Sequence, residues 1–120
     1  MRSKLIHGFA LCLISLQAFA YDGPPWYQVE ATAKQMAFAK QKASYNLMDP
    51  SAAQFRNMFA ISRGMGDDTI CGEMNAKNAY GAYTGFKPFY VDEDGKFQAY
   101  SPEDPIGMTV PMICNKPRKK

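Results

Sequence analysis

Apolar and polar residues follow two different periods along this chain. Between Tyr27 and about Leu47 the composition turns to Ala, Gln, Lys and Met, which favour helix. The apolar residues of this segment fall near one side of a helix at 3.6 residues per turn: Val29, Ala33, Met36, Ala43 and Leu47. This pattern predicts one long N-terminal helix.

Beyond Asp49-Pro50 the pattern changes to short runs of aromatic and branched residues separated by turn signals. The helix is expected to end here, because the residue before a proline resists the helical conformation. Four strands are predicted: Phe55–Ser62, Thr69–Asn75, Gly85–Val91 and Lys96–Tyr100. Residues 101–111 include Pro102, Pro105 and Pro111 and are expected to be irregular.

These elements predict an α+β fold, with one long N-terminal helix packed on a small antiparallel sheet of about four strands in two layers. The acidic run at 92–95, Asp-Glu-Asp-Gly, has a superficial likeness to a calcium loop. It lacks the later ligands that an EF-hand requires. It is therefore predicted to be the turn of a hairpin between the last two strands.

The first twenty residues have the pattern of an export signal. Arg2 and Lys4 precede an apolar run, and Ala18-Phe19-Ala20 supplies the small-x-small cleavage pattern. The run is shorter than the roughly 20 residues that span a bilayer, so no transmembrane segment is predicted. The alternative is a buried N-terminal helix. We expect cleavage after Ala20 and a periplasmic or secreted protein, with a single domain at 21–115 and a basic tail at 116–120.

Removal of the signal changes the charge balance. The chain has 14 basic and 11 acidic residues, and loss of Arg2 and Lys4 leaves a net charge of about +1. Four of the remaining basic residues lie in the last five positions: Lys116, Arg118, Lys119 and Lys120. Such a tail can contact anionic lipid, nucleic acid or acidic protein, but more often it is a solvated, disordered end. Without a wider basic face, no nucleic-acid partner is expected.

Two cysteines remain after signal removal, Cys71 and Cys114. In an oxidising compartment an isolated pair indicates one disulfide. It would close a loop of about 43 residues and contribute roughly 4 kcal/mol by the chain-entropy estimate. The alternative is two unpaired buried thiols.

The missing residue types exclude several chemistries. His7 is the only histidine, and it is lost with the signal, which excludes Ser-His-Asp and Cys-His catalysis and histidine-ligated zinc or haem. No cofactor and no metal are expected. Paired carboxylates remain possible, and Glu73 is the acid that lies among the most unusual residues of the chain.

Those residues form the stretch from Cys71 to Tyr90, which is dense in Gly, Asn, Tyr and Phe. The candidate binding residues are Asn75, Lys77, Asn78, Tyr80, Tyr83 and Phe86. Asparagine and glycine suit a sharp turn, which favours a structural role. A domain of about 100 residues cannot bury all of the nearby aromatic rings, which favours a recognition surface. Both roles can coexist in one loop.

Two signatures resemble a family of small exported bacterial and prophage-associated proteins that are largely uncharacterised. One is Asp49-Pro50-x-x-Ala53-x-Phe55-Arg56; the other is Cys71-Gly72-x-x-Asn75-Ala76-Lys77-Asn78-x-Tyr80-Gly81-x-Tyr83-x-Gly85-Phe86. Where the family pattern often has two glycines before the tyrosine, this chain has Gly81 and Ala82. The resemblance covers about residues 47–90 and implies an exported single domain without an established reaction.

The leading hypothesis is an exported, non-enzymatic binding protein of the inhibitor, immunity or exclusion type. It would act on an envelope protein or glycan through the loop from Asn75 to Phe86. One alternative is a small cell-wall hydrolase that uses Glu73 with a second acid, and this requires a raised pKa at the catalytic acid. Another is a structural envelope component whose basic tail contacts an anionic surface.

Overall fold

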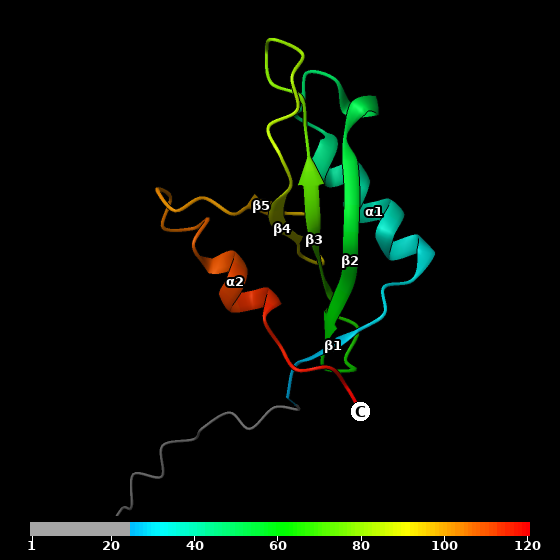
Figure 1. The fold of residues 1–120 in the computed structure, drawn as a ribbon. Coiled ribbons are helices and arrows are strands. Elements are labelled where there is room, and N and C mark those ends of the chain that lie inside the picture. Colours follow the sequence, from blue (N-terminus) through cyan, green and yellow to red (C-terminus); the bar gives the residue numbers. More distant parts are fainter. Residues whose placement is uncertain (1–24) are drawn as a thin grey trace, which may run out of the picture.

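A computed structural model describes residues 25–120. The predicted export signal, residues 1–20, lies outside the described residues. The described chain forms a sheet with helices on both sides of it (Figure 1). In chain order the elements are β1 (Tyr27–Val29), α1 (Ala33–Ser44), the 3₁₀ turn η1 (Pro50–Ala52), β2 (Gln54–Ser62), β3 (Thr69–Asn75), β4 (Lys87–Val91), β5 (Phe97–Ala99) and α2 (Thr109–Cys114).

The five strands form one sheet in the order β1-β2-β3-β4-β5, and each neighbouring pair is antiparallel. The β4–β5 connection is the hairpin turn that the acidic run predicts. There the Asp92 carboxylate accepts hydrogen bonds from the backbone N–H groups of Asp94 (3.0 Å) and Lys96 (2.9 Å). Gly95 adopts a φ of +84°, which glycine tolerates without steric cost.

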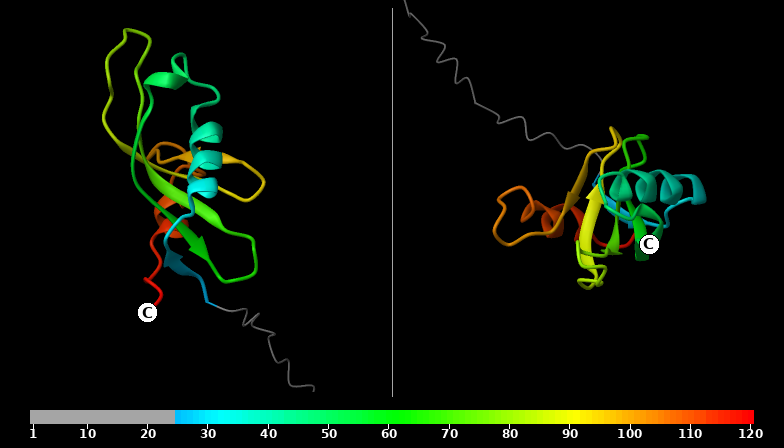
Figure 2. Two further views of the ribbon diagram at one scale, coloured as in Figure 1. Left: turned by 90° about the vertical axis from the view of Figure 1, so that its right-hand side faces the viewer. Right: turned by 90° about the horizontal axis from the view of Figure 1, so that it is seen from above.

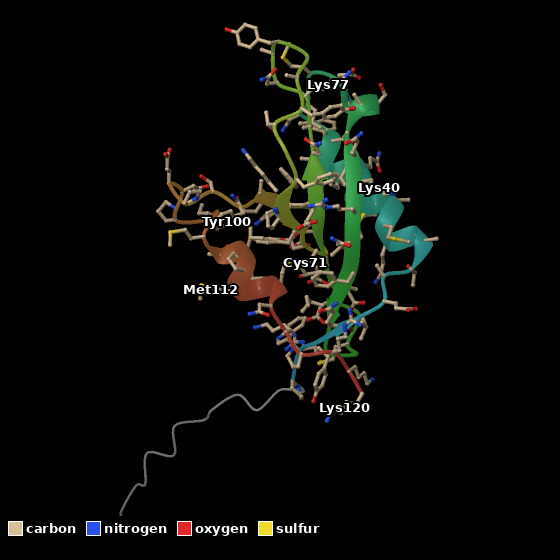
Figure 3. All side chains as sticks on the ribbon, in the orientation of Figure 1. Lys40, Cys71, Lys77, Tyr100, Met112 and Lys120 are labelled. Carbon is tan, nitrogen blue, oxygen red and sulfur yellow. A yellow bond between two sulfur atoms is a disulfide. The ribbon has the colours of Figure 1, made fainter. Side chains whose placement is uncertain are left out.

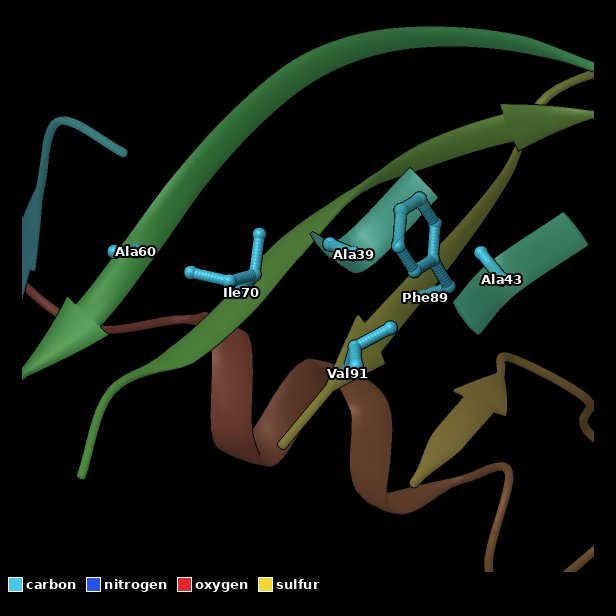
Figure 4. Packing of buried hydrophobic residues seen from close by; sticks show 6 residues of the cluster. All are labelled: Ala39, Ala43, Ala60, Ile70, Phe89 and Val91. Atoms are coloured by element: carbon cyan, nitrogen blue, oxygen red, sulfur yellow. The ribbon is translucent and has the colours of Figure 1, made fainter. Parts of the chain in front are cut away.

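Helix α1 covers one face of the sheet. Ala39 and Ala43 lie one turn apart and are almost fully buried, and their small side chains let the helix approach the strands closely. The Phe89 ring meets the Phe55 ring edge-on, with 5.9 Å between ring centroids. The buried cluster on this face consists of Ala39, Ala43, Ala60, Ile70, Phe89 and Val91 (Figure 4).

Helix α2 packs on the opposite face, as the view from above shows (Figure 2). Val110 is fully buried there, and Ile61 and Cys71 of the sheet are buried on the same side. The predicted disulfide is confirmed: Cys71 in β3 is bonded to Cys114 at the end of α2, with 5.9 Å between the Cα atoms.

The predicted long N-terminal helix is wrong. Residues Tyr27–Val29 form β1, which pairs with Ala60–Ser62, and α1 has only twelve residues. The helix begins where Thr32 and Gln35 form a capping box: the Gln35 N–H bonds the Thr32 hydroxyl oxygen (3.1 Å), and the Thr32 N–H bonds the Gln35 side-chain oxygen (2.9 Å). A strong cap at Thr32 favours an extended chain before it.

The predicted two-layer sheet of about four strands is also wrong. β1 adds a fifth strand at one edge, and α2 adds a layer on the face that α1 leaves open. Part of the segment expected to be irregular is helical, because α2 begins at Thr109. Pro111 is accommodated in the first turn of α2, where the backbone N–H has no helical partner to lose.

The basic tail is not a free end. Its backbone pairs with β1 in parallel: the Gln28 N–H donates to the Pro117 carbonyl oxygen (2.8 Å), and the Lys119 N–H donates to the Gln28 carbonyl oxygen (3.1 Å). The expectation of a disordered end is therefore wrong, because an unpaired strand edge was available to the tail.

Across residues 25–120, no helix has the length and apolar character needed to cross a bilayer.

Candidate functional site

The β3–β4 connection extends beyond the sheet as a narrow hairpin, which we call the tip loop (residues 76–86; Figure 1). Its two sides are held together by backbone hydrogen bonds. The Asn78 N–H bonds the Ala82 carbonyl oxygen (2.8 Å), and the Thr84 N–H bonds the Ala76 carbonyl oxygen (3.2 Å). The tip loop is therefore an ordered continuation of the sheet.

Asn78 builds the turn at the end of this loop. Its side-chain oxygen accepts the backbone N–H groups of Tyr80 (2.9 Å) and Ala82 (3.1 Å), and its carbonyl oxygen accepts the N–H of Gly81 (3.0 Å). Gly81 adopts a φ of +78°, as the closing residue of such a hairpin requires. The Asn78 amide oxygen is thus used within the loop.

Asn75 fixes the base of the tip loop. It is the one buried polar side chain among the described residues, at 8% exposure. Its side-chain oxygen accepts the Gly85 N–H (2.9 Å), and its side-chain nitrogen donates to the Gln54 side-chain oxygen (3.2 Å). One amide therefore joins β2, β3 and the returning arm of the loop.

Tyr83 ties the loop to a different part of the chain. Its hydroxyl donates to the carbonyl oxygen of Ala52 in η1 (2.9 Å). The Lys77 ammonium lies 5.4 Å from the centroid of the Tyr83 ring, within the range of a cation–π contact. The Tyr83 ring remains 42% exposed, so it serves as an anchor without leaving the surface.

Tyr80 differs from these anchors. Its backbone N–H bonds Asn78, but its side chain is 94% exposed at the end of the hairpin. An aromatic ring held in solvent by a fixed backbone contributes nothing evident to the core. It is the surface residue for which the tip loop gives no internal role.

A polar cluster lies beside the loop on β2 and β3. The Glu73 carboxylate accepts hydrogen bonds from the Arg56 Nε (2.6 Å) and the Asn57 side chain (3.0 Å). The Arg56 guanidinium also stacks on the Phe86 ring, 3.8 Å from its centroid. Asn57 occupies a β-bulge with a φ of +53°, a conformation that asparagine tolerates better than most residues.

The contacts in this cluster favour the charged form of Glu73. Hydrogen bonds from Arg56, and then from Asn57, stabilise the charged form and lower the pKa of the Glu73 carboxyl below its ordinary value. A general acid for glycoside cleavage needs the opposite shift. The Glu73 carboxylate is held in its charged form beside Arg56 and Asn57.

The structure brings all six sequence-predicted binding residues onto one hairpin but divides them by role. Asn75, Asn78 and Tyr83 hold its shape, and Tyr80 is presented to solvent. Arg56 and Asn57 were not among the predicted residues, although they contact Phe86 and Glu73. The role of Arg56 could have been predicted from the sequence. Both strands, β2 and β3, were predicted, and their pairing places Arg56 opposite Glu73.

The described residues offer no evident metal site: within 25–120, no three His, Cys, Asp or Glu side chains are grouped so that they could hold an ion.

Comparison with known proteins assigns this chain to no family. No family model matches the chain, no curated protein matches it, and no solved structure matches its fold.

Proposed function

We propose that this chain is an exported, non-enzymatic binding protein of the cell envelope, of the inhibitor, immunity or exclusion type. The tip loop is its binding surface, and the partner is an envelope protein or glycan. The observation that carries the proposal is Tyr80, which is 94% exposed on a hairpin whose backbone is fixed at its tip and at its base.

The fixed backbone supports a binding role for physical reasons. A loop already held in one conformation loses little entropy when a partner binds, and this raises affinity. Tyrosine is suited to such a position, because its rigid ring and hydroxyl offer both apolar contact and a hydrogen bond. The neighbouring Arg56 and Phe86 extend the polar and aromatic surface at the base of the loop.

Export is supported by the Cys71–Cys114 disulfide, since such bonds persist mainly in oxidising compartments. The hydrolase alternative finds less support. It requires an acid with a raised pKa, whereas Arg56 and Asn57 lower the pKa of Glu73. A binding protein therefore agrees better with the chemistry of this site.

The proposal is tested by affinity capture from a bacterial cell-envelope extract, with the disulfide intact. Wild type is compared with Tyr80→Ala and with Tyr45→Ala, which removes a tyrosine of similar exposure (80%) at the end of α1. We expect one partner to be retained by wild type and Tyr45→Ala and lost by Tyr80→Ala. Equal retention by all three proteins would place binding elsewhere, and capture of nothing would count against a binding protein.

A further inference from the structure

A groove of about 760 Å³ lies where β1 ends, well away from the tip loop. Figure 3 shows Lys77 of the tip loop and Lys120 of the tail at opposite ends of the molecule. The groove is lined by residues of β1 and the segment after it, by α1, by β2 and by the tail: Gln28, Val29, Glu30, Ala31, Met36, Met58, Phe59, Arg118, Lys119 and Lys120. No residue of the tip loop lines this groove.

The groove opens beside an incomplete strand pairing. β1 pairs with β2 only at Ala60–Ser62, although β2 begins at Gln54. Over residues 54–59, β2 has no strand neighbour on this side within the described part of the chain. This edge is roughly 20 Å long, at about 3.3 Å per residue, and the bulge at Asn57 interrupts it. Met58 and Phe59, which line the groove, are the part of the edge with which an extended segment can pair.

The lining of the groove indicates what kind of segment fits. Its apolar part includes Met36, Met58 and Phe59, and methionine side chains adapt readily to different apolar partners. Its charged part has three basic side chains, Arg118, Lys119 and Lys120, against the single acid Glu30. The tail that carries these charges is held in place by its backbone pairing with Gln28.

We propose that this groove binds an extended, acidic segment of a partner protein. The segment pairs its backbone with the open edge of β2 as an added strand. Its apolar side chains contact Met36, Met58 and Phe59, and its carboxylates lie against the basic tail. Strand addition supplies affinity through main-chain bonds, while the charges on the tail select acidic sequences over basic ones.

The test uses two eight-residue capped peptides that alternate Val with Glu or Val with Lys, titrated into the isotope-labelled full-length domain. We expect saturable binding of the Val-Glu peptide, with amide shifts concentrated at 28–31 and 58–59. The Val-Lys peptide should bind at least ten-fold more weakly. Lys119→Glu/Lys120→Glu should lose at least ten-fold in affinity for the Val-Glu peptide, while the charge-matched control Lys87→Glu/Lys96→Glu retains it.

Three results would overturn this proposal. One is absence of Val-Glu binding, or equal binding of both peptides. A second is unchanged affinity in Lys119→Glu/Lys120→Glu. The third is a concentration-dependent shift of the same amides without peptide, accompanied by dimerisation, which would show that a second copy of the chain occupies the groove. Each result is independent of the Tyr80 experiment, because Tyr80 does not line the groove and the substitutions in the tail leave the tip loop unchanged.

Discussion

At the scale of single residues, most named side chains of the tip loop hold its shape, whereas the side chain of Tyr80 is exposed to solvent. Asn78 and Asn75 use their amides for backbone hydrogen bonds, and Tyr83 uses its hydroxyl in the same way. Removing these groups would change the shape of the tip loop as well as its chemistry. Tyr80 is different, since truncating an exposed ring leaves the hairpin bonds intact.

Glu73 gives a prediction about pH at this scale. Its folded-state pKa lies below the ordinary value of 4.5, so the stabilisation it provides is present above that value and is lost as the pH falls through the folded pKa. Glu73→Gln should therefore lower the free energy of unfolding at pH 7 by up to about 1 kcal/mol, since the pair is partly exposed. The difference should shrink below pH 4.5.

Urea denaturation at pH 7 and pH 3 measures this, with Glu103→Gln as a control for loss of an exposed acid. If the Glu73→Gln deficit were the same at both pH values, the interaction with Arg56 and Asn57 would not depend on the charge of the carboxylate.

At the scale of elements, the tip loop acts as one unit because it is tied to η1 as well as to its own strands. Tyr83→Phe removes the hydroxyl bond to the Ala52 carbonyl oxygen and nothing else. We expect a loss of about 1 kcal/mol in local stability, which corresponds to about five-fold faster amide exchange at Asn78 and Thr84. Exchange in β2 and β3 should be unchanged.

Hydrogen exchange followed by NMR makes this measurement, and Tyr80→Phe is the matched control in the same loop. Unchanged exchange in Tyr83→Phe would mean that the contact with η1 does not hold the loop.

Some elements of the fold could be predicted from the sequence, and others could not. The acidic turn at 92–95 and the disulfide were predictable, because both depend on local residue chemistry or on a single possible pairing. β1 could not be predicted, because a strand of three residues is too short to show a periodicity of its own. It forms because its backbone pairs with β2. The Thr32 and Gln35 capping box was a usable signal for the true start of α1.

The candidate site shows the same limit. Its six residues are close in sequence, so their placement on one loop could be predicted. The division into anchors and an exposed residue could not be predicted, because it depends on Ala52, Gln54 and Arg56, which lie 21 to 31 positions before the loop residues that they contact.

At the scale of the whole molecule, two surfaces of different chemistry lie at opposite ends of one sheet. The tip loop, which contains Lys77 and the exposed Tyr80, lies at one end of the molecule, and the groove beside the basic tail, which contains Lys120, lies at the other (Figure 3). α1 and α2 cover opposite faces between them (Figure 2). α2 is short, and its attachment to β3 through Cys114 keeps it on the sheet.

The disulfide should therefore carry a large share of the stability. The bond spans 43 residues, and its removal by Cys71→Ala/Cys114→Ala should lower the free energy of unfolding by about 4 kcal/mol, out of the roughly 5–15 kcal/mol typical of a domain. Urea denaturation of the variant and of wild type, with and without reductant, tests this. Equal midpoints in all samples would mean that α2 is held by packing alone.

The measurement that tests the central claim most directly is the dissociation constant of the captured envelope partner for three proteins, by titration calorimetry. Wild type and Tyr45→Ala should bind equally. Tyr80→Ala should bind at least ten-fold more weakly, because an exposed aromatic anchor at the centre of an interface contributes roughly 1.4 kcal/mol or more. Equal dissociation constants for wild type and Tyr80→Ala, with both proteins folded, would contradict the assignment of the tip loop as the binding surface.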